Sequence, residues 1–426
     1  MKRRQFLIKT VQKILIFLSP ILFSFKTVQA QKQQTEEQLK NPGDFPMDKN
    51  SRKTRNKSGS IRLFLCGDVM VGRGIDQILP HPSDPRIYEP YMRNAAHYVV
   101  LAEKINGPIP RSVSFEYIWG DTLDIFKQIK PDVRIINLET SITANNDYWQ
   151  GKGINYRMHP KNIPCLTAAH IDCCVLANNH VLDWGYQGLV DTINILDDVK
   201  IKTAGAGMNI KQAESPAIIK ANGKGRVIVF SFADESSGVY PGWTATKTRP
   251  GVNLLEDLTD RSINNIARLI QSIKQANDIV VASIHWGSNW GYHISKKQQK
   301  FAHKLIDIAG TDIIHGHSSH HVKGIEIYKE KPIIYGCGDL LSDYEGITGN
   351  EQFRDDLGLM YFISMDPKSR KLTQFNLVPT QIRRFKLNQA SQTDTQWLAE
   401  VLNREGKHFN NEVTINKDNS FTLHWR

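Results

Sequence analysis

The sequence predicts an α/β fold in which strands and helices alternate and build a large sheet system. From residue 61 onward, short apolar runs of strand character alternate with stretches of helical periodicity, the pattern of a layered α/β domain. Five of the apolar runs end on a carboxylate, an amide or an imidazole. These side chains bind metals or transfer protons, so the same pattern also predicts where the chemistry lies.

The five runs follow one another along the chain, each with its polar end. They are residues 61–67 before Asp68, 133–138 before Glu139, 172–177 before Asn178, Asn179 and His180, 279–284 before His285, and 311–314 before His315, Gly316 and His317. In α/β proteins, ligands collect outside the carboxyl ends of strands. We therefore expect one polar cluster, with the mixture of carboxylate, amide and imidazole that hydrolytic metal sites use.

The remaining elements complete the predicted domain over residues 59–385. Residues 226–232 and 332–335 are further strands, and residues 262–276 and 295–308 have helical periodicity. After about residue 385 we expect a helix over 393–404 and two short strands. We interpret residues 386–426 as a C-terminal appendage packed on the domain.

The N-terminus has the pattern of an export signal. Residues 1–30 hold six basic and no acidic side chains, and an apolar run over 14–25 is followed by small side chains at 28–30. The pair Arg3-Arg4 resembles a twin-arginine signal, whereas a general secretory signal or an uncleaved membrane anchor remain alternatives. We expect an exported, periplasmic or otherwise extracytoplasmic protein, with residues 31–58 as a flexible polar tether.

Charge and cysteine content exclude two broad classes. The net charge of +11 falls to a mild surplus, 48 basic against 43 acidic residues, once residues 1–30 are removed. We expect no nucleic-acid partner, because the chain also lacks the aromatic-basic stripe that single strands require. Five cysteines, an odd number lying mostly in apolar runs, argue against a disulfide framework.

Each candidate residue has a structural alternative when taken alone. Asp68 could cap a turn or helix, Asn179 could cap a helix beside a partly buried His180, and His285 could be a core histidine. Glu139 is stronger evidence for a functional site than Asp68, because a buried carboxylate at a strand end needs a metal or an arginine to compensate its charge.

The densest signal is a group of four histidines within seven residues, after the run 311–314. Its members are His315, His317, His320 and His321. Clustered imidazoles repel one another when protonated, and a bound metal holds them neutral. The candidates together therefore favour a metal centre over separate structural roles.

Several short motifs follow one another along the chain: Gly67-Asp-Val-Met-Val-Gly-Arg73, Asn137-Leu-Glu139, Ala177-Asn-Asn-His180 with Asp183-Trp-Gly185, His285-Trp-Gly287, and Gly316-His317. In this order they resemble the CapA family of bacterial capsule or poly-gamma-glutamate synthesis proteins. The resemblance covers about residues 60–345. It implies a four-layer α/β/β/α metallophosphoesterase-like sandwich, two divalent metal ions (Mn, Fe, Zn or Mg), and an exported, membrane-associated protein.

The resemblance also implies roles for individual residues. The metal ligands are Asp68 at the first metal, Glu139 bridging both, Asn179, His285, His317 and His320. His180 is the proton donor, and Arg73 pairs with an anionic substrate. Asn178 and His321 are assigned to substrate binding. His321 is also the alternative to His320 as a metal ligand, because Ser318-Ser319 alters the motif spacing. Two departures from ordinary phosphoesterases are Met70 in place of a histidine and a glutamate as the bridging residue.

The leading functional hypothesis is a metal-dependent hydrolase, of phosphoesterase type, that supports synthesis or export of capsule or poly-gamma-glutamate. Its partners would be an anionic polymer or phosphoester substrate and a membrane polymer synthase or exporter. One alternative is a non-catalytic accessory that holds metal or polymer for such a synthase. Another is a metal-free binding protein with a vestigial site.

Overall fold

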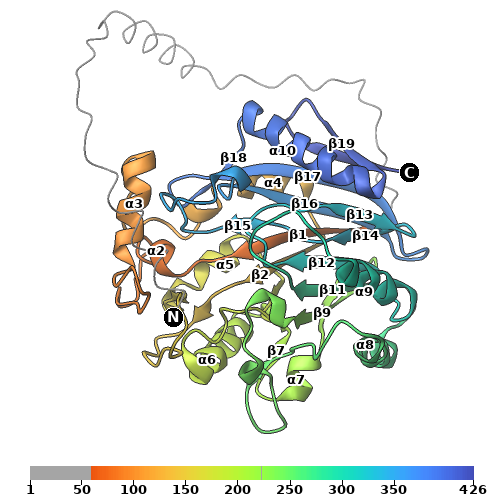
Figure 1. Ribbon diagram of the computed structural model, residues 1–426, viewed down its shortest axis with the longest axis horizontal. Helices are drawn as coiled ribbons and strands as arrows, with labels where there is room; N and C mark the ends of the chain where they lie inside the picture. The colour runs from red at the N-terminus through yellow and green to blue at the C-terminus, as the bar shows by residue number, and fades with distance from the viewer. Residues whose placement is uncertain (1–58, 222) are drawn as a thin grey trace, which may run out of the picture. The chain divides into compact units, whose positions relative to one another are not determined.

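Two β-sheets pack face to face in the structure, a computed structural model that describes residues 59–221 and 223–426 (Figure 1). The predicted signal over residues 1–30 and the predicted tether over 31–58 lie outside the described residues. Among the helices that are described, none has the length and apolar content needed to cross a membrane.

The larger sheet has ten strands within the described residues and runs in the order β19-β20-β17-β16-β1-β2-β5-β6, with β15 beside β1 and β18 beside β17. Its strands are β1 (Ile61–Val69), β2 (Val133–Leu138), β5 (Cys173–Val175), β6 (Lys202–Ala204), β15 (Asp339–Leu341), β16 (Leu357–Asp366), β17 (Lys371–Ile382), β18 (Leu387–Gln389), β19 (Asn411–Ile415) and β20 (Phe421–Trp425). Strands β15, β1, β2, β5 and β6 are parallel, so their carboxyl ends share one edge.

The second sheet has six strands in the described part of the chain, in the order β13-β14-β12-β11-β9-β8. They are β8 (Ala217–Lys220), β9 (Arg226–Ala233), β11 (Ile279–His285), β12 (Ile313–His317), β13 (Ile325–Tyr328) and β14 (Lys331–Ile334). The central strands β9, β11, β12 and β14 are parallel. Two small pairs stand apart: β3 (Ser141–Ile142) with β4 (Arg157–Met158), and β7 (Ala206–Gly207) with β10 (Gly251–Val252).

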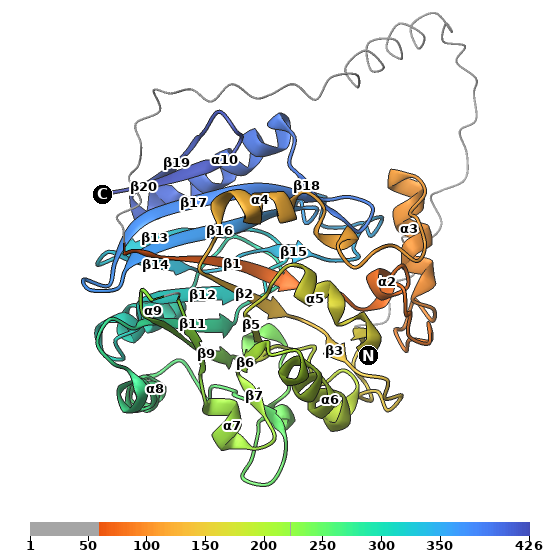
Figure 2. The same cartoon turned by 180° about the vertical axis from the view of Figure 1, so that it is seen from behind.

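Helices cover the outer faces of the two sheets, with α8 and α9 on one side and α5 and α6 on the other (Figure 2). The helices are α2 (Arg73–Asp76), α3 (Ala96–Asn106), α4 (Thr122–Ile129), α5 (Pro164–Ala168), α6 (Gly185–Asp198), α7 (Ile210–Glu214), α8 (Asp260–Ile273), α9 (Lys296–Asp307) and α10 (Gln392–Gly406). Ser295 caps α9 with Gln298 in a capping box, which fixes the start of that helix.

Strand alternation assigns each side chain to one of three cores. In β1, Leu63 and Leu65 face the core between the two sheets, whereas Phe64 and Cys66 face the core beneath α4 and α6. The third core lies between the second sheet and the helices α8 and α9. Helix, sheet, sheet and helix thus form four layers, which confirms the predicted α/β/β/α sandwich.

The predicted elements are present with small shifts of their ends. The helix expected over 295–308 is Lys296–Asp307, and the strand expected over 172–177 is the shorter Cys173–Val175. The expected appendage over 386–426 is more integral than predicted, because β18 and β20 pair with β17 and extend the larger sheet. All five cysteines are buried and free, and the adjacent Cys173 and Cys174 face different cores.

Candidate metal centre

The carboxyl ends of strands from both sheets meet at one place, as the sequence predicts. In the larger sheet, Asp68 in β1 pairs in register with Asn137 in β2 and with Asp339 in β15. In the second sheet, His285 at the end of β11 lies beside His317 at the end of β12. Contacts between these two groups join the sheets at a single polar cluster.

Short distances within the cluster bring the predicted ligands together. The Nε2 atom of His285 lies 3.7 Å from Oε1 of Glu139, and Nδ1 of His317 lies 4.0 Å from Oδ1 of Asp68. Asn137 connects the two carboxylates, because its Nδ2 donates to Oδ1 of Asp68 at 2.7 Å and to Oε2 of Glu139 at 3.1 Å. The Asn137 amide therefore links the carboxylates of Asp68 and Glu139 and fixes their positions.

The ligating atoms form two groups, each spanning less than 4.8 Å: Asp68 with His285 and His317, and Asp68 with His320 and Asp339. Asp68 belongs to both groups, whereas the resemblance implies Glu139 as the bridging ligand. Glu139 lies at the border of the first group, 3.7 Å from His285. Each group has the composition and spacing that could hold a divalent cation.

His320, rather than His321, faces the cluster. Its Nδ1 lies 2.9 Å from Oδ1 of Asp339. Ser318 adopts φ of +98°, a strained value for a residue with a side chain, and this turn brings His320 back to the site despite the altered spacing. The His321 ring instead stacks on Phe353 and accepts a hydrogen bond from the Gly291 amide.

Three buried atoms of the cluster lack any hydrogen-bond partner, namely Oδ2 of Asp68, Nε2 of His285 and Oδ2 of Asp339, and so does Oδ1 of Asn179, the residue before His180. Three oxygens and one imidazole nitrogen, all electron-pair donors, are the ligand set that divalent metals use. Unpaired acceptors inside a protein are costly, and a cation removes that cost. The residues therefore fit divalent metal ions.

The carboxylates of the cluster are destabilised in their charged form. Burial, with Asp339 as the second cause, raises the pKa of Asp68 to about 6. Burial and the neighbouring Asp68 raise the pKa of Glu139, and burial raises the pKa of Asp339. A divalent cation would favour the ionised carboxylates and reverse these shifts.

His180 lies at the edge of the cluster, with Nε2 3.8 Å from Oε1 of Glu139. Its Nδ1 lies 2.7 Å from Oδ2 of Asp183, and the ammonium of Lys152 lies 2.6 Å from the other oxygen of that carboxylate and 2.9 Å from Nδ1. Burial lowers the pKa of His180 to about 4, although Asp183 opposes the shift. The ring is therefore neutral near pH 7, and Asp183 and Lys152 fix its orientation.

Two residues assigned to substrate binding instead form ion pairs or hydrogen bonds with other residues of the protein. Arg73 is 2% exposed, and its guanidinium pairs with Asp343 at 2.5 Å and with Glu89 at 3.1 Å instead of facing the cluster. Asn178 donates to the Leu138 carbonyl and to Oδ1 of Asn137, and its own Oδ1 accepts from the amides of His180 and Val181. Asn178 therefore shapes the turn that carries Asn179 and His180.

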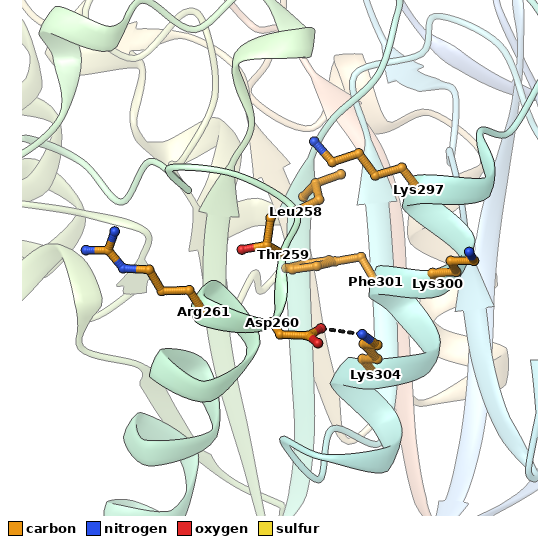
Figure 3. A pocket seen from close by; sticks show the side chains of 8 residues that line it. All are labelled: Leu258, Thr259, Asp260, Arg261, Lys297, Lys300, Phe301 and Lys304. Atoms are coloured by element: carbon orange, nitrogen blue, oxygen red, sulfur yellow. Dashed lines mark hydrogen bonds and ion pairs between the residues drawn. The ribbon is translucent and has the colours of Figure 1, made fainter.

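A hollow of about 320 Å³ adjoins the second group of ligands and is lined by Tyr344 and Asp355, among others. The Tyr344 ring lies 5.3 Å from the His320 ring, which places this hollow beside the cluster. A second hollow, of about 410 Å³, lies between α8 and α9 (Figure 3). Asp260 there already pairs with Lys304, and no ligand group of the cluster reaches it.

Four residues of the site carry no role in the sequence prediction: Asn137, Lys152, Asp183 and Asp339. Asp339 follows the predicted strand 332–335 after Gly336-Cys-Gly338, so it could have been counted as a sixth polar strand end. Lys152 lies in an irregular loop, and nothing in the local sequence indicates that its ammonium reaches Asp183.

Known proteins match this chain over most of its length. The family described as bacterial capsule synthesis protein PGA_cap matches residues 62–344. A Mycobacterium tuberculosis protein named "probable polyglutamine synthesis accessory protein" is 47% identical over 360 residues, which cover 84% of this chain and 94% of that protein. The capsule biosynthesis protein CapA of Bacillus anthracis is 26% identical over 283 residues, covering 66% and 60%. A solved structure of a Mycoplasma pneumoniae phosphatase overlaps 75% of this chain and 93% of that one, with a TM-score of 0.41 and 12% identity, too low to support an argument about activity.

Proposed function

This chain belongs to the bacterial capsule synthesis family PGA_cap, and from that membership we propose that it is an exported accessory protein of polyglutamate or capsule synthesis that acts as a metal-dependent hydrolase. The resemblance to the CapA family is thereby confirmed, whereas hydrolysis, metal binding and export are our proposals. The N-terminal pattern of residues 1–30 supports export.

The observation that carries the proposed activity is a set of four buried electron-pair donor atoms that have no hydrogen-bond partner, on Asp68, Asn179, His285 and Asp339. Three of these residues belong to the two ligand groups, and Asn179 directly precedes His180 at their edge. The free-energy cost of burying these unpaired acceptor atoms together would be offset if divalent cations bind them.

Asp68, His285 and His317 would hold one divalent ion, and Asp68, His320 and Asp339 the other, with Glu139 beside the first. When bound, such ions supply Lewis acidity and a water of lowered pKa. The chain's own residues supply the charge balance: three buried carboxylates offset much of the charge of two divalent ions, so the site keeps a net attraction for an anionic group.

His180 would transfer the proton. Its Nδ1 side is held by Asp183, so Nε2 is the nitrogen that faces the cluster and reaches a leaving oxygen. An anionic group next to Nε2 favours the protonated ring, and that proton is then delivered to the departing oxygen. Lys152 and Asp183 orient the ring and do not touch the substrate in this scheme.

The test combines metal content with hydrolysis. The purified protein should contain close to two divalent ions per chain by mass spectrometry, and the double variant Asp68→Asn/His285→Ala should lose them. The loaded protein should hydrolyse a phosphoester or an anionic polymer such as poly-gamma-glutamate. A wild-type protein that takes up no manganese, iron or zinc would refute the metal centre and the hydrolysis together.

A second candidate is a non-catalytic accessory that binds metal or polymer for a membrane synthase or exporter. The observation in its favour is that Arg73, Asn178 and His321, the three expected substrate contacts, are all engaged within the protein. A strain carrying His180→Gln separates the two candidates. Full polymer production by that strain would favour the accessory role, and loss of production with an intact metal content would favour hydrolysis.

A further inference from the structure

Behind the proposed ligands, a chain of hydrogen bonds runs into the core between the sheets. Ser283 Oγ lies 2.8 Å from Nε2 of His317 and 3.0 Å from Nδ1 of His315. At one end, Nε2 of His315 lies 2.7 Å from the Cys66 carbonyl oxygen, and at the other, Nδ1 of His317 lies 2.8 Å from Nδ1 of His285. The four side chains are completely buried.

The Cys66 carbonyl is a fixed end for this chain because it can only accept. It lies where the pairing of β1 with β2 shifts register, between Leu65 and Asp68, and β1 leaves its regular pairing with β16 after Leu65. An irregular strand directs a carbonyl away from the ladder. Here that carbonyl faces the His315 ring on the neighbouring sheet.

The direction of every bond then follows from the first. The carbonyl requires a proton on Nε2 of His315, so in the neutral ring Nδ1 is an acceptor and takes the Ser283 hydroxyl proton. The Ser283 oxygen in turn accepts from Nε2–H of His317, which leaves a lone pair on Nδ1 of that ring. His285 must donate to this lone pair from its own Nδ1, so its Nε2 also carries a lone pair.

One lone pair is left over at the end of this chain, on Nε2 of His285, because the lone pair of His317 Nδ1 already accepts the hydrogen bond from Nδ1–H of His285. Nε2 of His285 is 3.7 Å from Oε1 of Glu139 and has no hydrogen-bond partner. The rings are neutral because they are buried with centroids 5.0 Å and 5.1 Å apart, where two positive charges would repel strongly.

We propose that His315 and Ser283, neither of which is a ligand, form a relay anchored on the Cys66 carbonyl that sets the tautomers of His317 and His285, so that His285 presents the lone pair of its Nε2 to the metal centre. This inference rests on the proposed function for its purpose. The relay itself is a property of the metal-free protein. His315 and Ser283 are therefore positioning residues of the centre.

The relay is tested first by nitrogen NMR of the histidine rings in the metal-free full chain. We expect neutral rings with the proton on Nε2 in His315 and His317 and on Nδ1 in His285, each ring assigned by substitution of one histidine at a time. A proton on Nδ1 of His315, or on Nδ1 of His317, would overturn the relay. This measurement decides the inference even if the protein binds no metal and the proposed function fails.

Ser283→Ala is the perturbation, and Mn²⁺ titration by calorimetry is the second readout. Breaking the relay should weaken Mn²⁺ binding by about tenfold or more, the usual effect of removing a partner of a ligating histidine. Ser283→Thr, which keeps the hydroxyl, should restore the affinity. Unchanged affinity and unchanged ring tautomers in Ser283→Ala would overturn the relay.

Ser231→Ala is the matched control. Ser231 lies beside Ser283 in register on the adjacent strand β9 and is equally buried, but its hydroxyl has no hydrogen-bond partner. The two variants remove the same group from the same row of one sheet. Only Ser283→Ala should change Mn²⁺ affinity, and an equal loss in both variants would assign the effect to packing and refute the relay.

Discussion

Replacing Asp68 by asparagine should stabilise the metal-free protein while abolishing metal binding. Burial and the nearby Asp339 raise the pKa of Asp68 from 3.8 to about 6. Ionisation of this carboxyl therefore opposes folding increasingly above pH 3.8, and the cost reaches about 3 kcal/mol near neutral pH. Because Oδ2 has no hydrogen-bond partner and Oδ1 accepts from Asn137, an asparagine can keep the bond from Asn137 while it removes the charge.

The pH dependence of the free energy of unfolding shows the sign of this effect. The penalty is complete above the folded pKa and fades as the pH falls toward 3.8, where the carboxyl is protonated in both states. Urea unfolding with a chelator should therefore show Asp68→Asn more stable than wild type by about 3 kcal/mol near neutral pH, and by about half of that at about pH 5.

Asp76→Asn is the control for this experiment. Asp76 is also buried, but both of its oxygens accept hydrogen bonds, from Ser83, His159 and Asn162. The same substitution there should destabilise the protein by about 1–3 kcal/mol, because one oxygen is replaced by a donor. If Asp68→Asn also destabilised the metal-free protein near neutral pH, the reasoning about an unbalanced carboxylate cluster would be wrong.

Three further outcomes are expected. His320→Ala should lose about one divalent ion per chain by mass spectrometry, whereas His321→Ala should keep both, and equal losses would contradict the assignment of His320 as the ligand. His180→Gln and Asp183→Asn should each lower turnover by about a hundredfold or more with the metal content unchanged, and full activity in either variant would remove the proton-transfer role. Mn²⁺ at about 100 times its Kd should raise the free energy of unfolding by about 2.7 kcal/mol, reversibly with chelator, and no change in thermal unfolding would argue against a folded-state metal site.

The layered fold and the meeting of strand ends could be predicted because both follow from local patterns. Apolar runs define strands, and the polar residue that ends each run reports the carboxyl edge of a parallel sheet. Asp68, His285 and His317 lie where that argument placed them. Such a pattern does not depend on which strands become neighbours.

The partners of each side chain depend on tertiary neighbours, and there the prediction was weaker. Arg73 was expected to meet substrate, but Asp343, 270 residues further along the chain, neutralises it in the folded protein. The choice between His320 and His321 depends on the backbone of Ser318, which sequence spacing does not report. Lys152 reaches Asp183 from an irregular loop, which has no periodicity to interpret.

The proposed ligands come from both sheets, with Asp68 and Asp339 on the larger and His285 and His317 on the smaller. The ion that Asp68, His285 and His317 would hold takes ligands from both sheets, so it would cross-link them in the middle of the sandwich. The chain could not capture it before the two sheets had docked, and the sheets could not separate without releasing it. Under the proposed function, the supply of divalent metal after export would then govern how long each molecule survives proteolysis, quite apart from any turnover it performs.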